Sequence, residues 1–155
     1  MLLLPAILLL VGFGAPAPAA RTLDESPEAD LERAISGYTG LYRRDALEEW
    51  RKLFLPGFVA GSLRPDGSVL QRSLDEFFGA QKRYLDSGRA IQETLENIET
   101  RRFGALASVT AAFVLEDEGE RSRGRLILTL LRAEGHFRIQ SLVFAYDPKP
   151  TPGGP

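Results

Sequence analysis

The second half of the chain constrains the fold most strongly, because it consists almost entirely of predicted strands. From residue 89 onward, β-branched and bulky residues become frequent, and only short turns interrupt them. We predict strands over residues 90–103, 105–115, 123–133 and 137–146. Strands joined by such short turns pair as an antiparallel meander, so a sheet should form the centre of the core.

The first half carries helix signals instead. Ser26, Pro27 and Glu28 combine a capping serine, a proline suited to the first helical position and an acid near the positive end of the helix dipole. Ser73 and Glu76 have the spacing of a capping box. We therefore predict that one helix begins at each of these two points.

Another helix is predicted between these two. Asp45 and Glu48 form a capping box in its aspartate form. The short helix that follows would carry Trp50 and Phe54 on its apolar side and would end at Pro56.

A short hairpin is predicted before the last helix. The sequence Arg-Pro-Asp-Gly at residues 64–67 is typical of a tight turn, and residues 58–63 and 68–72 would be its strands. The order is then helix, helix, hairpin, helix and four long strands, which indicates an α+β domain. One face of such a sheet packs on the helices, and the other meets water or a partner.

The N-terminal segment has the composition of a signal peptide. Residues 2–13 are almost wholly apolar, and the small residues that follow include an A-x-A site, with cleavage preferred after Ala19. We predict a signal peptide over residues 1–19, a linker over 20–26, a folded domain over 27–147 and a disordered tail over 148–155. The protein would be exported, periplasmic or secreted, without a stable membrane span after cleavage.

Composition narrows the function classes. The net charge is −2 and acids are interleaved with the arginines, so we expect no nucleic-acid partner. One histidine and no cysteine leave no set of transition-metal ligands, and no glycine-rich phosphate loop occurs. We therefore expect no metal and no cofactor. Without disulfides, an exported domain also needs a real hydrophobic core.

The order of these elements, with several local motifs, resembles the nuclear-transport-factor-2-like superfamily, also called cystatin-like. The resemblance covers residues 27–146 and rests on Trp50-Arg51-Lys52-Leu53-Phe54 with Pro56, Pro65-Asp66-Gly67, Leu74 with Phe77-Phe78, Gly124 before LILTLL, and Gly135-His136-Phe137-Arg138-Ile139. Many relatives have tryptophan where Phe137 stands. The resemblance implies a cone-shaped fold, with three N-terminal helices packed on a curved, mainly antiparallel sheet of four to six strands. It also implies an apolar pocket open at one end and homodimers formed through the sheet.

Catalytic groups known in that superfamily are hard to find in this sequence. A ketosteroid-isomerase-like site needs an aspartate on the short strand after the second helix, and residues 58–63 read FVAGSL without an acid. SnoaL-like or dehydratase chemistry uses a histidine paired with an acid. The single histidine, His136, follows Gly135 in a predicted hairpin, so we interpret it as a turn residue.

A charged cluster on the first long strand supplies the residue types of an epoxide-hydrolase-like site. We interpret this cluster as surface ion pairs between neighbouring strands. Side chains along a strand point alternately to the two faces of the sheet. Strict alternation would put Glu93, Glu99 and Arg101 on one face, and Glu96 and Arg102 on the other.

Aromatic residues supply the best candidates for a binding site. The resemblance places the first two helices around the pocket mouth, and Tyr38, Tyr42 and Trp50 on them are the predicted ligand-binding residues. The favoured hypothesis is non-catalytic binding of a small hydrophobic ligand or a protein partner. One alternative is a SnoaL-like or ketosteroid-isomerase-like enzyme (isomerase, dehydratase or hydrolase) on an apolar substrate. Another is a module that assembles as a homodimer through its sheet.

Overall fold

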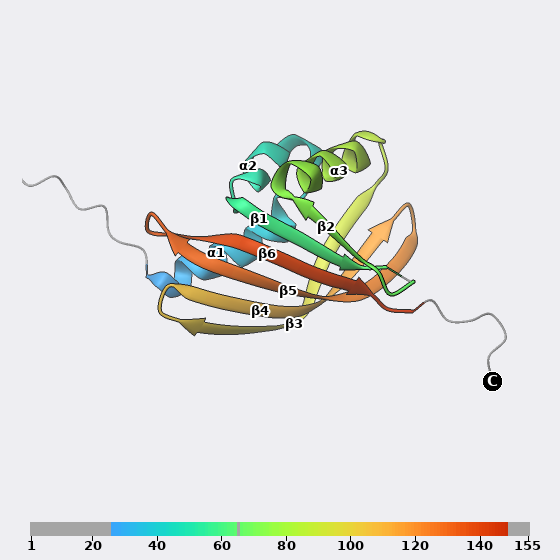
Figure 1. Ribbon diagram of the computed structural model, residues 1–155. Helices are drawn as coiled ribbons and strands as arrows, with labels where there is room; N and C mark the ends of the chain where they lie inside the picture. The colour runs from blue at the N-terminus through green and yellow to red at the C-terminus, as the bar shows by residue number, and fades with distance from the viewer. Residues whose placement is uncertain (1–25, 65, 149–155) are drawn as a thin grey trace, which may run out of the picture.

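A computed structural model describes residues 26–64 and 66–148 of the chain (Figure 1). The predicted signal peptide and its cleavage site lie outside these residues. The helical elements are α1 (Pro27–Gly40), the 3₁₀ turn η1 (Arg44–Ala46), α2 (Leu47–Arg51) and α3 (Leu74–Asp86). The strands are β1 (Phe54–Leu63), β2 (Val69–Ser73), β3 (Ile91–Phe103), β4 (Leu106–Asp117), β5 (Glu120–Ala133) and β6 (His136–Tyr146).

The six strands form one sheet in the order β2-β1-β6-β5-β4-β3. All neighbours pair antiparallel except β1 and β6, which run parallel. The four long strands form the predicted meander, and the β1–β2 hairpin joins its last strand (Figure 1). The predicted α+β class, with helices and a mainly antiparallel sheet, is confirmed.

Two helix starts agree with their sequence signals. The Ser26 hydroxyl caps α1 by accepting a hydrogen bond from the Ala29 amide at 3.2 Å. At α3 both halves of the capping box are present, because the Ser73 hydroxyl accepts from the Glu76 amide and the Glu76 carboxylate accepts from the Ser73 amide. Each cap satisfies a backbone amide that has no partner within its own helix.

The prediction for the second helix is wrong in its start and its end. Asp45 forms an ion pair with Arg43 at 3.0 Å and does not cap α2, which has only five residues. Phe54 already belongs to β1, where it lies opposite Ile139 of β6 and is buried. Pro56 lies inside this strand, where the β1–β6 register shifts, so its missing amide breaks no regular ladder. Pairing with β6 therefore overrides the helical spacing.

A bulge in β3 makes the predicted alternation wrong. The register of β3 against β4 shifts between Glu96 and Glu99, and Asn97 adopts a positive φ of 52° there. One extra residue reverses the inside–outside pattern beyond that point. Glu99 and Arg101 therefore lie on the sheet face opposite Glu93 rather than beside it.

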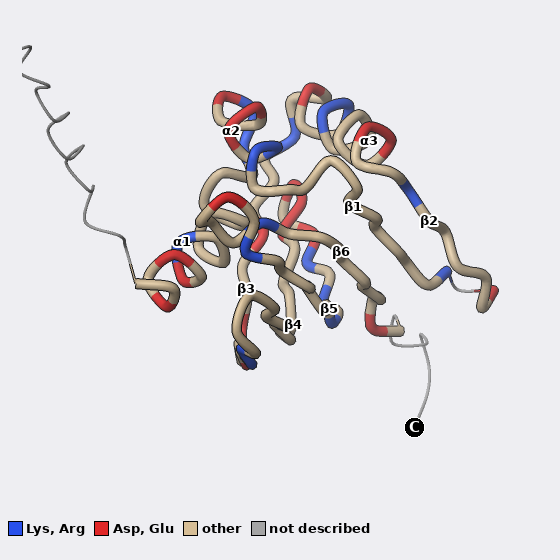
Figure 2. The backbone as a smooth tube through the Cα atoms, turned by 60° about the vertical axis from the view of Figure 1, so that its left-hand side comes forward, with Lys and Arg blue, Asp and Glu red and all other residues tan. Residues whose placement is uncertain are grey.

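The core lies between the helices and one face of the sheet. Trp50 is its centre, with ring centroids 5.2 Å from Tyr42, 4.6 Å from Phe54 and 5.8 Å from Phe77. Helix α1 packs against β6, and α3 packs against β1 and β2. Charged side chains lie mainly on the helices and strand ends, whereas β1 carries none (Figure 2).

One buried carboxylate joins α1 to the start of β6. Asp30 is 3% exposed and accepts a hydrogen bond from the Phe137 amide at 2.6 Å. The His136 Nδ1 lies 3.1 Å from the same carboxylate, and Arg33 also contacts it. Burial raises the pKa of Asp30, but these three hydrogen bonds outweigh burial and hold it below its usual value.

Candidate catalytic and ligand-binding pocket

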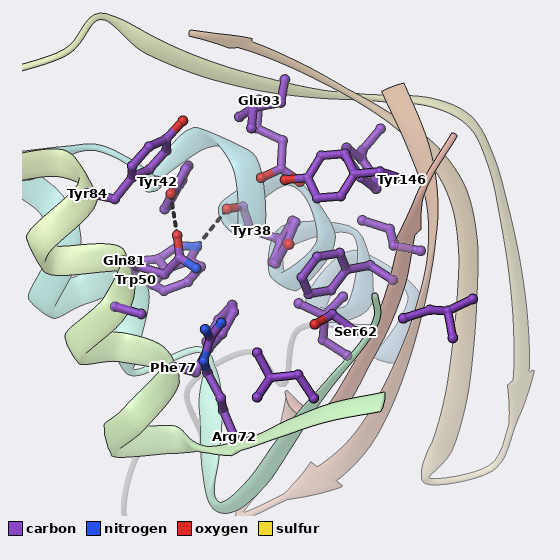
Figure 3. A pocket seen from close by; sticks show the side chains of 18 of the residues that line it. Tyr38, Tyr42, Trp50, Ser62, Arg72, Phe77, Gln81, Tyr84, Glu93 and Tyr146 are labelled. Carbon is purple, nitrogen blue, oxygen red and sulfur yellow. Dashed lines mark hydrogen bonds between the residues drawn. The ribbon is translucent and has the colours of Figure 1, made fainter. Parts of the chain in front are cut away.

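A cavity of about 510 Å³ lies between the helices and the sheet (Figure 3). All four tyrosines of the chain and its single tryptophan line this cavity. Aliphatic and phenyl side chains from the sheet complete the walls, among them Phe113, Leu115, Leu126, Leu142 and Phe144. Its size and largely apolar lining suit a small organic molecule.

The three predicted binding residues all line this cavity, although their role in binding stays a prediction. Trp50 is 2% exposed and donates its indole N–H to the Tyr38 carbonyl at 2.7 Å. Tyr42 donates its hydroxyl to the Gln81 side-chain oxygen. Because the indole N–H of Trp50 and the hydroxyl of Tyr42 are satisfied by neighbours, these two side chains chiefly present ring surface to the cavity.

Glu93 directs its carboxyl group into the cavity, beside Tyr146 (Figure 3). No ion pair joins it to a cation among residues 26–64 and 66–148, and Tyr38 is the side chain that acts on its pKa. Burial raises the pKa of Glu93 to about 7, because the apolar walls disfavour the charged form and the Tyr38 hydrogen bond offsets this only in part. Near neutral pH the carboxyl can therefore both accept and donate a proton.

Tyr146 carries a hydroxyl that is available to a ligand. Tyr42 is hydrogen-bonded to Gln81, and Tyr84 to Asp117 at 2.6 Å. Within the described part of the chain, the Tyr146 hydroxyl has no hydrogen-bond partner. Burial and the nearby Glu93 charge raise the pKa of Tyr146, so this hydroxyl keeps its proton and can donate it in a hydrogen bond.

The interpretation of the β3 charges as surface ion pairs between neighbouring strands is wrong for Glu93, and for two others it is correct for the ion pair but not for the partner. Glu96 pairs with Arg123 of β5, which β4 separates from β3, and Arg102 pairs with Glu28 of α1 at 2.6 Å. A sequence signal for Glu93 was present, because it alternates with Ile91 and Leu95, which pack against the core. An acid in that alternation indicates a carboxyl on the inward face.

Other residues that the sequence interpretation missed are polar groups on the pocket's second side. Ser62 of β1, Arg72 of β2 and Gln81 of α3 all line the cavity. They come from three elements that are consecutive in sequence, yet no motif marks them as a group. His136, by contrast, starts β6 beside Asp30 and does not line this cavity.

The described residues contain neither a cluster of metal ligands nor a helix that could span a membrane. Among residues 26–64 and 66–148, no three His, Cys, Asp or Glu side chains converge to hold a metal ion. The expectation of no cofactor stays a prediction. None of the helices in this part of the chain is long and apolar enough to cross a bilayer.

Similar structures share this architecture. A proposed dehydratase of the nuclear-transport-factor-2-like family from Streptomyces avermitilis superposes with a TM-score of 0.65 and 17% identity, over 80% of this chain and 100% of that one. The beta subunit of a proposed aromatic-ring-hydroxylating dioxygenase from Novosphingobium aromaticivorans gives 0.63 and 14%, over 79% and 90%. A nuclear-transport-factor-2-like protein of unknown function from Silicibacter pomeroyi gives 0.57 and 23%, over 77% and 95%.

These similarities concern the fold. No family model matches the chain. No curated protein matches it either. The identities to solved structures are all low, so they establish the three-dimensional architecture and leave the activity open. The chain has the nuclear-transport-factor-2-like, cystatin-like fold, as the sequence motifs predict.

Proposed function

On this fold, we propose that the domain binds a small, largely apolar carbonyl compound and catalyses proton transfer at the carbon next to the carbonyl, with Glu93 as base and acid. The observation that carries the proposal is the Glu93 carboxyl, which faces an apolar cavity without a neighbouring cation among the described residues. The non-catalytic hypothesis rested on the lack of an acid in the pocket, and Glu93 removes that premise.

The proton-transfer step uses groups that already line the pocket. The Glu93 carboxylate takes a proton from the carbon, and the electron pair of the broken C–H bond moves toward the carbonyl oxygen. The enolate oxygen accepts a hydrogen bond from the Tyr146 hydroxyl, which stabilises its charge. Glu93 then returns the proton to the same carbon or to a conjugated carbon, which completes an exchange or an isomerisation.

The environment of Glu93 suits this role. A general base works best when its pKa lies near the working pH, and burial raises the pKa of Glu93 to about 7. The Tyr38 hydroxyl offsets part of the effect of burial on this pKa. The rings of Tyr42, Trp50 and Phe113 supply apolar surface for the rest of the molecule.

The test uses 2-tetralone, an apolar two-ring ketone with exchangeable protons next to its carbonyl. Proton NMR in D₂O measures how fast these protons are replaced by deuterium. We expect the wild-type protein to accelerate exchange, and Glu93→Gln to reduce the acceleration about a hundredfold or more, because positioned acid–base groups contribute that much. The matched control is Glu96→Gln, which makes the same change on the outer face of β3 and should exchange like wild type.

Two results would decide against catalysis. Wild-type protein that binds 2-tetralone without accelerating exchange would leave the binding function alone. Equal acceleration by wild type and Glu93→Gln would exclude Glu93 as the base.

We also propose that two copies associate through the outer face of the sheet. Gly61, Val143, Ile127 and Thr110 lie side by side across four strands on that face. Val143 is 55% exposed and Ile127 is 49% exposed. The middle of this sheet face therefore exposes a row of uncharged side chains that includes two large apolar ones. Sedimentation equilibrium should show a dimer that Val143→Glu converts to a monomer. A wild-type monomer at micromolar concentration would exclude this association.

We also propose that the domain is exported. It rests on the apolar segment and the small residues before Ala19 in the sequence. Mass spectrometry of the protein recovered from the extracytoplasmic fraction should find an N-terminus at Ala20. An intact N-terminus on cytoplasmic protein would exclude export.

A further inference from the structure

We infer that Arg72 binds an anionic group of the ligand, so that the molecule in this pocket is a carboxylic acid whose carboxylate lies across the cavity from Glu93. This deepens the proposed function and rests on it for the reaction at Glu93. The anion site itself rests on separate observations.

The β1–β2 hairpin directs Arg72 inward. Arg72 lies opposite Ala60 in the register of β1 and β2, and Ala60 is 3% exposed on the core side of β1. Leu70, two residues earlier, also lines the cavity, as strand alternation requires. Figure 3 shows the Arg72 side chain extending into the cavity toward Gln81, on the side away from Glu93.

Arg72 has no carboxylate partner within the described part of the chain. The two nearest acids in sequence are already engaged, since Asp75 pairs with Arg51 and Glu76 caps Ser73. The Glu76 carboxylate acts on Arg72 only from beyond ion-pair distance, so among the described residues the half-buried guanidinium has no carboxylate in direct contact. A bound carboxylate would supply that contact.

The position of Arg72 along the chain adds to this argument. It directly precedes Ser73, the N-cap of α3, where the helix dipole favours negative charge. A cation at that point gains nothing from the helix. Apart from its longer-range attraction to Glu76, its placement is therefore explained by what it meets in the cavity.

Other hydrogen-bond donors lie on the same side of the cavity. The Gln81 side-chain oxygen accepts from Tyr42, which leaves its amide N–H groups without a partner in the described residues. The Ser62 hydroxyl also lines the cavity, and Arg64 lies at its rim. The planar guanidinium matches the two-oxygen geometry of a carboxylate, and these donors line the same cavity.

The two sides of the pocket therefore differ in polarity. The positive charge of Arg72 lies on one side, and the Glu93 carboxyl lies on the other (Figure 3). An acid would orient with its carboxylate away from Glu93, because the reverse orientation brings two carboxyl groups together. With a volume of about 510 Å³, the cavity suits a monocarboxylic acid with a ring-sized apolar body.

The test compares two probes of the same shape, 2-naphthoate and its neutral amide 2-naphthamide, by isothermal titration calorimetry. We expect wild type to bind 2-naphthoate roughly tenfold to a hundredfold more tightly than the amide, the range of charge-assisted hydrogen bonds. Arg72→Gln should abolish this preference, and Arg72→Lys should keep part of it. The matched control is Arg101→Gln, which removes the same charge from the outer face of β3 and should keep the preference.

Several results would overturn the inference. Equal binding of acid and amide by wild type, no binding of 2-naphthoate at millimolar concentration, or an undiminished preference in Arg72→Gln would each do so. Tighter Arg72-dependent binding of 2-naphthyl phosphate would exclude the carboxylate class. Glu93→Gln should keep the preference for 2-naphthoate, so failure of the exchange test at Glu93 is distinguishable from failure of the anion site.

Discussion

The hydroxyl of Tyr38, on the first helix, lowers the pKa of Glu93, on the first long strand, and both residues line the pocket. It stabilises the ionised carboxyl, whereas burial favours the neutral one. Burial is the larger effect, so Glu93 titrates near neutral pH instead of in the usual acidic range.

Replacing Tyr38 by phenylalanine should raise the pKa of Glu93 further above 7, because burial would then act without the opposing hydrogen bond. A ¹³C NMR titration of the glutamate side-chain carboxyls measures this. Tyr84→Phe is the control, since the Tyr84 hydroxyl donates to Asp117 instead. A lower or unchanged Glu93 pKa in Tyr38→Phe would contradict this role of the hydrogen bond.

Stability should depend on pH through Glu93. The carboxyl has a folded pKa of about 7, above its ordinary value of 4.5, so the folded state holds the proton more tightly than the unfolded state. Wild type should therefore lose stability relative to Glu93→Gln as the pH rises from about 4.5 to about 7, with a constant difference above that range. Urea unfolding across this range measures it. A pH-independent difference between the two proteins would show that burial does not shift the pKa.

Asp30→Ala should destabilise the fold by about 1–3 kcal/mol, because the buried Phe137 amide would lose its acceptor. The control is Glu32→Ala on the exposed side of α1, which should change the free energy of unfolding little. The folded pKa of Asp30 lies below its ordinary value of 3.8, so its contribution is present above that value and is lost as the pH falls through the folded one. Equal urea midpoints for both variants would exclude the fastening role of Asp30.

Gly124→Ala should destabilise the protein and disturb the pocket wall. A Cβ at Gly124 would overlap the Ala145 carbonyl and the ring of Phe113, which lines the cavity. Gly40→Ala at the end of α1 meets nothing within 4 Å and should be neutral or slightly stabilising. Thermal unfolding compares the two, and Gly124→Ala with wild-type stability would contradict the close packing at Phe113.

Local signals explain which parts of the fold could be predicted from the sequence. Ser26 and Ser73 act on backbone amides a few residues away, so their helix starts are visible in the sequence. The end of α2 is not visible in the sequence, because Phe54 belongs to β1 through its pairing with Ile139, 85 residues further along the chain. Long-range pairing of that kind leaves no local pattern.

The site residues also divide into those that the sequence could place and those that it could not. Tyr38, Tyr42 and Trp50 could be placed at the pocket because the resemblance in sequence locates the first two helices. Glu93 was missed because the bulge at Asn97 breaks the alternation that grouped it with outer-face charges. Arg72 and Gln81 meet only after the hairpin and α3 fold over the sheet, so no sequence motif joins them.

The central claim is that a carboxyl inside the pocket exchanges protons near neutral pH. The most direct test is the ¹³C NMR titration of the side-chain carboxyls in wild type and in Glu93→Gln. One carboxyl resonance that titrates near pH 7 in wild type and is absent from Glu93→Gln would agree with this account. A Glu93 resonance that titrates near its ordinary value of 4.5 would contradict it. Non-catalytic ligand binding would then be the function left for the pocket.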